Sequence, residues 1–210
     1  MPQDFASILG DLKKQETLEI TQKWLASGKD PMAILNDARR GIEIVGQRFT
    51  SGEYFLPDLI YSGEILKQVT EMVAPELKGA AKVKKLGKVV LGTVAYDIHN
   101  IGLNMVDFML DTFGFEVYNL GVDVPAEKFV EKIKTTGAPI VGLSGFLTLS
   151  FNSMKETVDA IKAAGLRDKV KIMIGGAQMN DDIRKYAGAD AFGRDAVAAV
   201  SLVKQWIGGT

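Results

Sequence analysis

The chain has 210 residues, with 25 Lys plus Arg against 26 Asp plus Glu, so its formal net charge is −1. That balance argues against a nucleic-acid binder, which carries a basic face or tail. The sequence has no apolar run of the roughly 20 residues that a membrane span needs, and no cysteine for a disulfide or a thiolate ligand. The N-terminal residues lack the pattern of a signal peptide. We therefore expect a cytoplasmic protein with no nucleic-acid or membrane partner.

The first 75 or so residues carry the apolar spacing of helices. Apolar residues recur every three to four positions from Phe5 onward, and Gly28 ends that segment. Asp30 followed by Pro31 predicts the start of the next helix, because a capping carboxylate and a proline at the first helical position both favour one. The turn TSGEYFLP separates that helix from another, which ends near Pro75. This pattern indicates a small antiparallel helical bundle.

After residue 88, short apolar runs of strand length alternate with helical stretches. The runs are VVLGTVA, EVYNLGV, PIVGLSG and VKIMIGG, with a fifth near Phe192. Such alternation indicates a parallel sheet covered on both faces, here a flavodoxin-like, doubly wound α/β domain with five strands. The Lys-, Ala- and Gly-rich stretch 76–87 is interpreted as a linker. We expect a helical domain over residues 1–80, the end of the linker over 81–87 and the α/β domain over 88–210.

Unusual residues gather where four of these strands end, and ligands bind at that edge of an open parallel sheet. They are Tyr96, Asp97, Ile98, His99, Asn100, Ile101 and Gly102 after the first strand, Ser144, Phe146, Leu147, Thr148 and Ser150 after the third, Gly175, Gly176 and Ala177 after the fourth, and Ala196 beyond the fifth. A glycine pair after a strand is by itself most often part of a turn, and the hydroxyls can equally cap helices. Their combination at successive strand ends indicates a ligand site.

His99 is the only histidine of the sequence, and Asp97 precedes it by two residues. A carboxylate that accepts the proton of one ring nitrogen frees the other nitrogen as a lone-pair donor. This is typical of a metal-ligating histidine or of a general base, although no nucleophile motif such as G-x-S-x-G surrounds it. A zinc site takes three or four His, Cys or carboxylate ligands. A metal at His99 would therefore bring most of its ligands in a macrocycle, as in haem or corrin.

The D-x-H-x-x-G motif at residues 97–102 resembles that of the cobalamin-binding family of methyltransferase corrinoid proteins, which includes the cobalamin-binding module of methionine synthase. In this chain 41 residues separate the motif from Ser144, and 28 separate Phe146 from Gly175. Those spacings are close to the family's pattern of D-x-H-x-x-G, S-x-L and G-G. Phe146 stands where the family usually has leucine. The resemblance covers nearly the whole chain and implies a four-helix cap before the cobalamin domain.

The resemblance also implies roles for individual residues. Cobalamin would bind with its dimethylbenzimidazole tail off the cobalt and His99 as lower ligand, while Asp97 and Ser150 complete a hydrogen-bonded relay. The tail would be surrounded by Gly102, Gly175 and Gly176, which clear space, by Ser144 and Thr148, which hydrogen-bond, and by Ala196. Phe49 and Leu56, in the loop region of the cap, would cover the upper face of the corrin. Without the resemblance, these two side chains are interpreted as ordinary core residues of the bundle.

The function that the resemblance implies is that of a methyl carrier, holding cobalamin as methylcobalamin in one state. A substrate-specific corrinoid methyltransferase would supply the methyl group from a methoxyaromatic (O-demethylation), a methylamine, methanol or a betaine. A second methyltransferase would pass it to tetrahydrofolate or coenzyme M, and a reductive activase is a further expected partner. Three alternatives stay open: a cobalamin-binding sensor or regulator, the small subunit of a cobalamin-dependent mutase, and a receiver-like module without cobalt. A sensor would add a DNA-binding domain and a mutase subunit would lack the helical cap.

Overall fold

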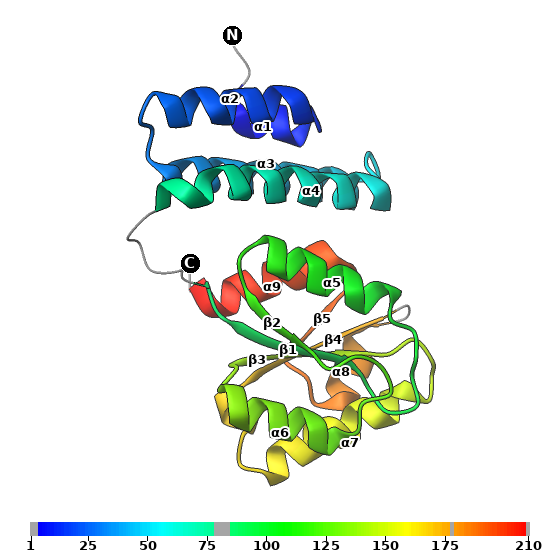
Figure 1. The fold of residues 1–210 in the computed structure, drawn as a ribbon. Helices are drawn as coiled ribbons and strands as arrows, with labels where there is room; N and C mark the ends of the chain where they lie inside the picture. Colours follow the sequence, from blue (N-terminus) through cyan, green and yellow to red (C-terminus); the bar gives the residue numbers. More distant parts are fainter. Residues whose placement is uncertain (1–3, 78–84, 177–178, 209–210) are drawn as a thin grey trace. The chain divides into compact units, whose positions relative to one another are not determined.

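The structure is a computed structural model that describes residues 4–77, 85–176 and 179–208. It consists of two compact units, a helical unit within residues 1–84 and an α/β unit within residues 85–210 (Figure 1). Most of the linker expected over residues 76–87 lies outside the described residues.

The helical unit contains four α-helices in its described part, as the resemblance implied. They are α1 (Phe5–Gly10), α2 (Lys14–Ala26), α3 (Pro31–Thr50) and α4 (Leu56–Val73), followed by the short 3-10 helix η1 (Ala74–Leu77). Asp30 caps α3 as expected, because its carboxylate accepts hydrogen bonds from the main-chain N–H groups of Met32 and Ala33 at 3.2 and 3.3 Å. Ile34 and Ile42, fully buried on the inner face of α3, anchor the core of the bundle.

The first helical segment differs from the expectation of one helix up to Gly28. The structure divides it into α1 and α2, with Leu12 in the left-handed region at a φ of 59° between them. The buried positions of α2 are Thr17 and Thr21 rather than its apolar residues. Each threonine hydroxyl donates to a carbonyl oxygen four residues earlier, at 2.8 Å, so its polar group needs no water. A polar residue that satisfies its hydroxyl in this way can occupy a core position.

The α/β unit is built on a five-stranded parallel sheet in the order β2-β1-β3-β4-β5. Its elements are β1 (Lys88–Thr93), α5 (Ile101–Thr112), β2 (Glu116–Asn119), α6 (Ala126–Thr136), β3 (Ile140–Ser144), α7 (Ser150–Ala163), the 3-10 helix η2 (Arg167–Lys169), β4 (Lys171–Gly175), α8 (Asp181–Ala187), β5 (Ala191–Gly193) and α9 (Ala196–Gly208). This order is that of flavodoxin-like folds. The expected fold class is therefore confirmed.

The helices cover both faces of the sheet (Figure 1), with α5 and α9 on one face and α6, α7 and α8 on the other. The face under α6 and α7 is filled by a continuous apolar cluster that includes Phe129, Met154 and Ile161. Phe129 is fully buried and lies against Gly92 of β1, where an added Cβ atom would come within 2.8 Å of its ring. On the other face, Leu110 of α5 is fully buried. A cavity lies on this face at the carboxyl ends of the strands.

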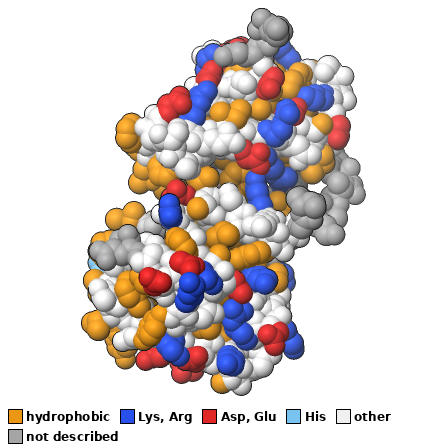
Figure 2. Space-filling view, turned by 180° about the vertical axis from the view of Figure 1, so that it is seen from behind, with side chains coloured by type: hydrophobic (Ala, Val, Ile, Leu, Met, Phe, Trp, Pro, Cys, Tyr) orange, Lys and Arg blue, Asp and Glu red, His pale blue; other side chains and the backbone are white. Residues whose placement is uncertain are grey.

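On the side drawn in Figure 2, acidic and basic side chains are interspersed on both units, so neither unit shows a face of one charge sign there. This agrees with the near-equal numbers of the two charge types in the sequence. None of the helices in the described residues combines the length and the apolar character that crossing a bilayer requires.

Candidate functional site

The site is organised by Asp97, which follows β1 and is completely buried. Its Oδ1 accepts the main-chain N–H of His99 at 2.9 Å and lies 3.0 Å from the ring Nδ1 of the same residue. Its Oδ2 accepts the hydroxyl of Ser150 at 2.5 Å and the main-chain N–H groups of Phe146 and Leu147 at 2.6 and 3.2 Å. One carboxylate thus joins the loop after β1, the loop after β3 and the first turn of α7.

These donors decide the charge of Asp97. Burial by itself raises the pKa of a carboxyl group, because it disfavours the charged form. The hydroxyl of Ser150 and the main-chain N–H groups of His99, Phe146 and Leu147 outweigh burial and hold the pKa of Asp97 well below its usual range. The carboxylate is therefore ionised at neutral pH. Since it can only accept, the ring Nδ1 of His99 must donate, and in the neutral ring Nε2 then carries the lone pair.

The His99 ring stands between this carboxylate and the surface. Its side chain is 46% exposed and stacks on the ring of Phe146, with centroids 4.7 Å apart and an interplanar angle of 28°. Phe146 stands where the family pattern has leucine. Its ring packs on the ring of His99, and its main-chain N–H donates to Asp97. The Asp97 carboxylate and the Phe146 ring thus both restrain the orientation of the His99 ring.

Glycine at position 145 brings α7 close to this network. A Cβ atom on Gly145 would come within 2.6 Å of the Ser150 Cβ and 2.8 Å of the Met154 Cε. Any side chain at this position would push α7 away, so glycine allows Ser150 to reach the carboxylate of Asp97. The Ser150 hydroxyl therefore serves Asp97, and the structure shows no side-chain hydrogen bond at the N-terminal cap of α7.

An open cavity of about 690 Å³ extends from His99 along the sheet toward α5 and α9. Its floor includes Leu91, Gly142 and Met173, which belong to three neighbouring strands. The expected site residues that line it are Ile98, His99, Asn100, Ile101, Gly102, Ser144, Phe146, Gly175, Gly176 and Ala196. The expected residues Tyr96, Asp97, Leu147, Thr148 and Ser150 are not part of its lining, and Ala177 lies outside the described residues. Phe49 and Leu56 belong to the helical unit.

At two of the glycines that line the cavity, neither a close contact nor the backbone φ angle in the described residues requires a glycine. An added Cβ on Gly102 would meet no atom within 4 Å, and one on Gly175 would meet only the Gly193 carbonyl oxygen at 3.9 Å. Neither residue has a positive φ. Gly176 is different, because its φ is 139° and a Cβ there would lie 1.8 Å from the carbonyl oxygen of Gly145. The space beside Gly102 and Gly175 fits a bound group that fills the cavity.

Large apolar side chains are exposed in the loop that carries His99, at the start of α5 and in the loop that carries Phe146. They comprise Tyr96, Ile98, Ile101, Phe146, Leu147 and Leu149. An exposed apolar patch of this kind marks a binding surface. A broad, flat and largely apolar ring system placed on it could contact the His99 Nε2 from above while a tail enters the cavity. The residues present therefore fit a large cofactor with an apolar ring system and a side group that the cavity can hold.

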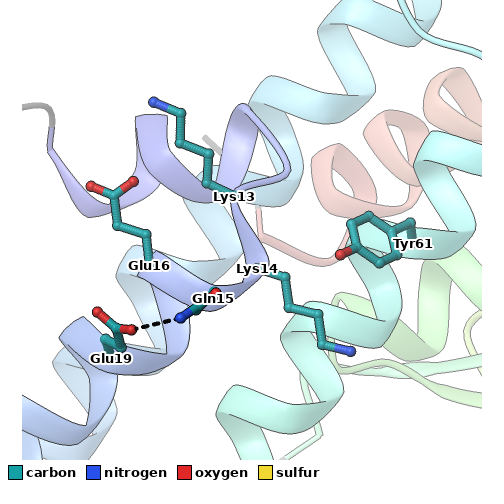
Figure 3. A pocket seen from close by; sticks show the side chains of 6 residues that line it. All are labelled: Lys13, Lys14, Gln15, Glu16, Glu19 and Tyr61. Carbon is teal, nitrogen blue, oxygen red and sulfur yellow. Dashed lines mark hydrogen bonds between the residues drawn. The ribbon is translucent and has the colours of Figure 1, made fainter.

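A second cavity, of about 430 Å³, lies in the helical unit between the start of α2 and α4 (Figure 3). It is lined by Lys13, Lys14, Gln15, Glu16, Glu19 and Tyr61. Lys14 pairs with Glu64 at 2.8 Å and Gln15 donates to Glu19 at 3.1 Å. These are surface pairs of small energetic value, so the cavity of the α/β unit is the candidate site.

Two residues of the network were not among those expected from the sequence. They are Thr93, the last residue of β1, and Asp123, which follows β2. Both hydrogen-bond the main chain of the loop that carries Asp97. Asp123 lies beyond the second strand, whose end carries none of the residues predicted for the site. The segment GVDVP, which follows the second strand, was the available signal.

The lowered pKa of Asp97 predicts how the stability of the cofactor-free protein depends on pH. An unfolded Asp takes up its proton near pH 4, at about its ordinary pKa, whereas folded Asp97 does so only at lower pH. The ionised carboxylate therefore stabilises the native state fully above about pH 4, and this contribution is lost as the pH falls further. In urea unfolding, the stability difference between the protein and its Asp97→Asn variant should shrink below about pH 4. The exposed Asp159→Asn variant is the control, and a gap for Asp97→Asn that stays constant into strong acid would contradict the assignment.

The comparisons with known proteins agree with this geometry. Family models described as B12 binding domain match residues 87–202 and residues 3–73. Trimethylamine corrinoid protein 1 of Methanosarcina acetivorans is 36% identical over 196 residues, which is 92% of this chain and 91% of that protein. A cobalamin-binding protein from Desulfitobacterium hafniense has a solved structure with 40% identity and a TM-score of 0.86, covering 97% of each chain.

A chain in the crystal structure of the methanol:cobalamin methyltransferase complex of Methanosarcina barkeri is also similar. It is 26% identical, with a TM-score of 0.79, over 99% of this chain and 79% of that one. The B12 binding domain that matches residues 87–202 spans more than half of the chain, and the corrinoid relative is similar over nearly its full length. The protein thus belongs to the cobalamin-binding corrinoid proteins that act with methyltransferases.

Proposed function

We propose that this protein is a methyl carrier that binds cobalamin in the α/β unit with His99 as the lower ligand of the cobalt. The single observation that carries the proposal is the buried Asp97 carboxylate, 3.0 Å from the His99 Nδ1, which leaves Nε2 as a lone-pair donor at the mouth of an apolar cavity. The bound cofactor supplies a cobalt centre that accepts and releases a methyl group. The protein supplies binding, orientation and a place for a proton.

The Asp97–His99 pair would hold and move that proton. With Nε2 on a metal ion, the ring proton would stay on Nδ1 and face the Asp97 carboxylate, whose negative charge would strengthen the ligand. Without a metal ion on Nε2, the lone pair of this nitrogen would be open to a proton from solvent. Ser150 keeps Asp97 ionised throughout by donating to Oδ2. Ligation and protonation of His99 would therefore exclude one another.

The cavity would receive the nucleotide tail of the cofactor. Gly102 and Gly175 leave the space for it, and Ser144 and Ala196 line the same cavity. Thr148, in the exposed loop before α7, would hydrogen-bond at the entrance. His99 would hold the cobalt through Nε2 in place of the base of that tail.

The helical unit would act as the cap over the upper face of the corrin. Phe49 lies near the end of α3 and is half-buried, while Leu56, at the start of α4, is exposed. Three further large apolar side chains of this region are exposed, namely Phe55, Ile60 and Tyr61. An apolar surface at one loop of a small bundle suits the exclusion of water and oxygen from a reactive cobalt centre.

For the methyl donor, we propose a methylated amine. The relative reported above at 36% identity is a trimethylamine corrinoid protein, and none of the relatives named here is associated with methoxyaromatic compounds, so O-demethylation gains no support. The partner would be a substrate-specific methyltransferase, as in the methanol:cobalamin complex that contains a similar chain. A second methyltransferase for coenzyme M or tetrahydrofolate and a reductive activase complete the proposed set of partners.

Full-length similarity favours a carrier over the alternatives from other classes. This chain and the trimethylamine corrinoid protein cover 92% and 91% of one another, so the match is not confined to a cobalamin domain attached to a DNA-binding region. The helical unit also matches a B12 binding domain over residues 3–73, which the mutase subunit would not share. The match to a B12 binding domain over residues 87–202 disfavours the third alternative, a receiver-like module without cobalt, and a carrier with a cap fits all of these matches.

The first test concerns the Asp97–His99 pair. The purified protein is expected to bind one cobalamin per chain, and Asp97→Asn should weaken binding or methyl transfer by about 10–100-fold, because an amide cannot supply the charge behind the histidine. Titration followed by visible absorption measures the affinity. Asp159→Asn serves as the matched control, and wild-type affinity and transfer rate for Asp97→Asn would contradict the relay.

A second test uses the empty space beside Gly102. Gly102→Leu should leave the cofactor-free fold intact, because nothing lies within 4 Å of the new Cβ. The side chain would project into the tail cavity and should cost roughly 1–3 kcal/mol of binding free energy, as overpacking does in protein cores. Gly208→Leu is the control, since Gly208 also has open space around it but lies outside the cavity. Equal cobalamin affinity for both variants would show that the tail does not pass Gly102.

The third test concerns the cap. The double variant Phe49→Ala and Leu56→Ala should still bind cobalamin through His99, but it should photolyse methylcobalamin faster and reoxidise faster after reduction, because the upper face loses its cover. Met72→Ala, a half-buried apolar residue at the far end of α4, controls for a general loss of stability. Rates are compared at a temperature where all the variants are folded. Unchanged rates in the double variant would rule out a shielding role for these two side chains.

A further inference from the structure

The loop between β1 and Asp97 has an unfavourable backbone conformation. Tyr96, immediately before the buried carboxylate, has a φ of 67°. This left-handed region is uncommon for residues other than glycine, asparagine and aspartate, and a bulky aromatic residue is especially disfavoured there. The Tyr96 side chain is also exposed, so it is not held in place by burial. The surrounding main-chain contacts must therefore maintain this conformation.

Asp123 provides those contacts from the end of β2. Its Oδ1 accepts the main-chain N–H of Tyr96 at 2.6 Å. Its own main-chain N–H lies 2.9 Å from the carbonyl oxygen of Asp97 and 2.9 Å from the hydroxyl oxygen of Thr93. The Thr93 hydroxyl in turn donates to the same Asp97 carbonyl oxygen at 2.5 Å. The backbone is thus bound on both sides of the Tyr96–Asp97 peptide bond.

The two loops are also joined around this point. Val94 and Val124 form an isolated parallel β-bridge, and the main-chain N–H of Val124 donates to the carbonyl oxygen of Thr93 at 3.1 Å. Asp123 itself has a φ of 52°, which aspartate tolerates better than most residues. Residue 123 must therefore combine tolerance of the left-handed region with a side-chain acceptor, and aspartate or asparagine meets both requirements.

We propose that Asp123 is a positioning residue that acts on His99 through Asp97. By holding the N–H of Tyr96 and the carbonyl of Asp97, it fixes the direction in which the Asp97 side chain leaves the main chain, and hence the oxygen that faces the His99 Nδ1. Asp123 does not line the cavity, and its contacts are with the main chain of the loop that carries Asp97. The consequence for cobalt rests on the proposed function, but the orientation of the histidine is a property of the protein alone.

The test compares Asp123→Gly with Asp123→Asn in the cofactor-free protein. Glycine accepts the positive φ without strain but removes the acceptor, whereas asparagine keeps an acceptor oxygen and tolerates the same φ. Because His99 is the only histidine, nitrogen NMR of protein grown on ¹⁵N-histidine reports its tautomer without ambiguity. Hydrogen exchange of the Tyr96 amide reports the bond to Asp123.

In the protein itself and in Asp123→Asn, the proton is expected on Nδ1 and the Tyr96 amide should be protected. In Asp123→Gly the Tyr96 amide should exchange about tenfold faster or more, as for the loss of a hydrogen bond to a charged group, and the Nδ1–H tautomer should lose its dominance. Amides of the α7 core, such as that of Ile161, serve as the internal reference for an intact fold. Asp159→Ala, on the surface of the same unit, is the control variant.

Two results would overturn the proposal. One is an Asp123→Gly protein that keeps the Nδ1–H tautomer of the parent, whether or not its Tyr96 amide is still protected. The other is a loss of both in Asp123→Asn as well, since the acceptor oxygen would then not be the cause. Neither measurement uses cobalamin. A failure of the unaltered protein to bind cobalamin would instead count against the proposed function, so the two failures are distinguishable.

Discussion

The interaction on which the site depends is the set of hydrogen bonds to one buried carboxylate. Asp97 has no exposed surface, and an unpaired charge in that position would be costly. Three main-chain N–H groups and the Ser150 hydroxyl meet that cost. Since these donors come from separate segments of the chain, the carboxylate also holds the segments together. The Asp97 carboxylate, which needs these hydrogen-bond donors to stay charged, thus also orders the loops that form the site.

The fold explains how such donors reach one point. The strand order β2-β1-β3-β4-β5 places β1 beside β3, and the loops after these two strands leave the sheet at the same edge. Asp97 and His99 come from the first loop, while Phe146 and Leu147 come from the second, and Ser150 begins α7. Small residues complete the arrangement, because Gly145 admits α7 and Gly102 leaves the cavity open. A network of this kind belongs to the switch point of a doubly wound sheet, where ligands bind.

Much of this arrangement could be predicted from the sequence, and the reasons are physical. Apolar runs separated by helical spacing indicate a parallel sheet, and an Asp two residues before the only His indicates an oriented imidazole. Other features have no local signal. The burial of Thr17 and Thr21 depends on how α2 packs, and the break at Leu12 depends on the tertiary structure around a left-handed residue. The stack of Phe146 on His99 likewise joins residues 47 positions apart, and only the folded chain brings them together.

The proposed function centres on His99, oriented by Asp97, as the residue that holds the cobalt. Its most direct test is electron paramagnetic resonance of the Co(II) form bound to protein grown on ¹⁵N-histidine with unlabelled cobalamin. Because the chain has one histidine, any ¹⁵N coupling on cobalt must come from His99. The account predicts a single ¹⁵N coupling in the lower position. Coupling to ¹⁴N from the dimethylbenzimidazole of the cofactor would contradict it.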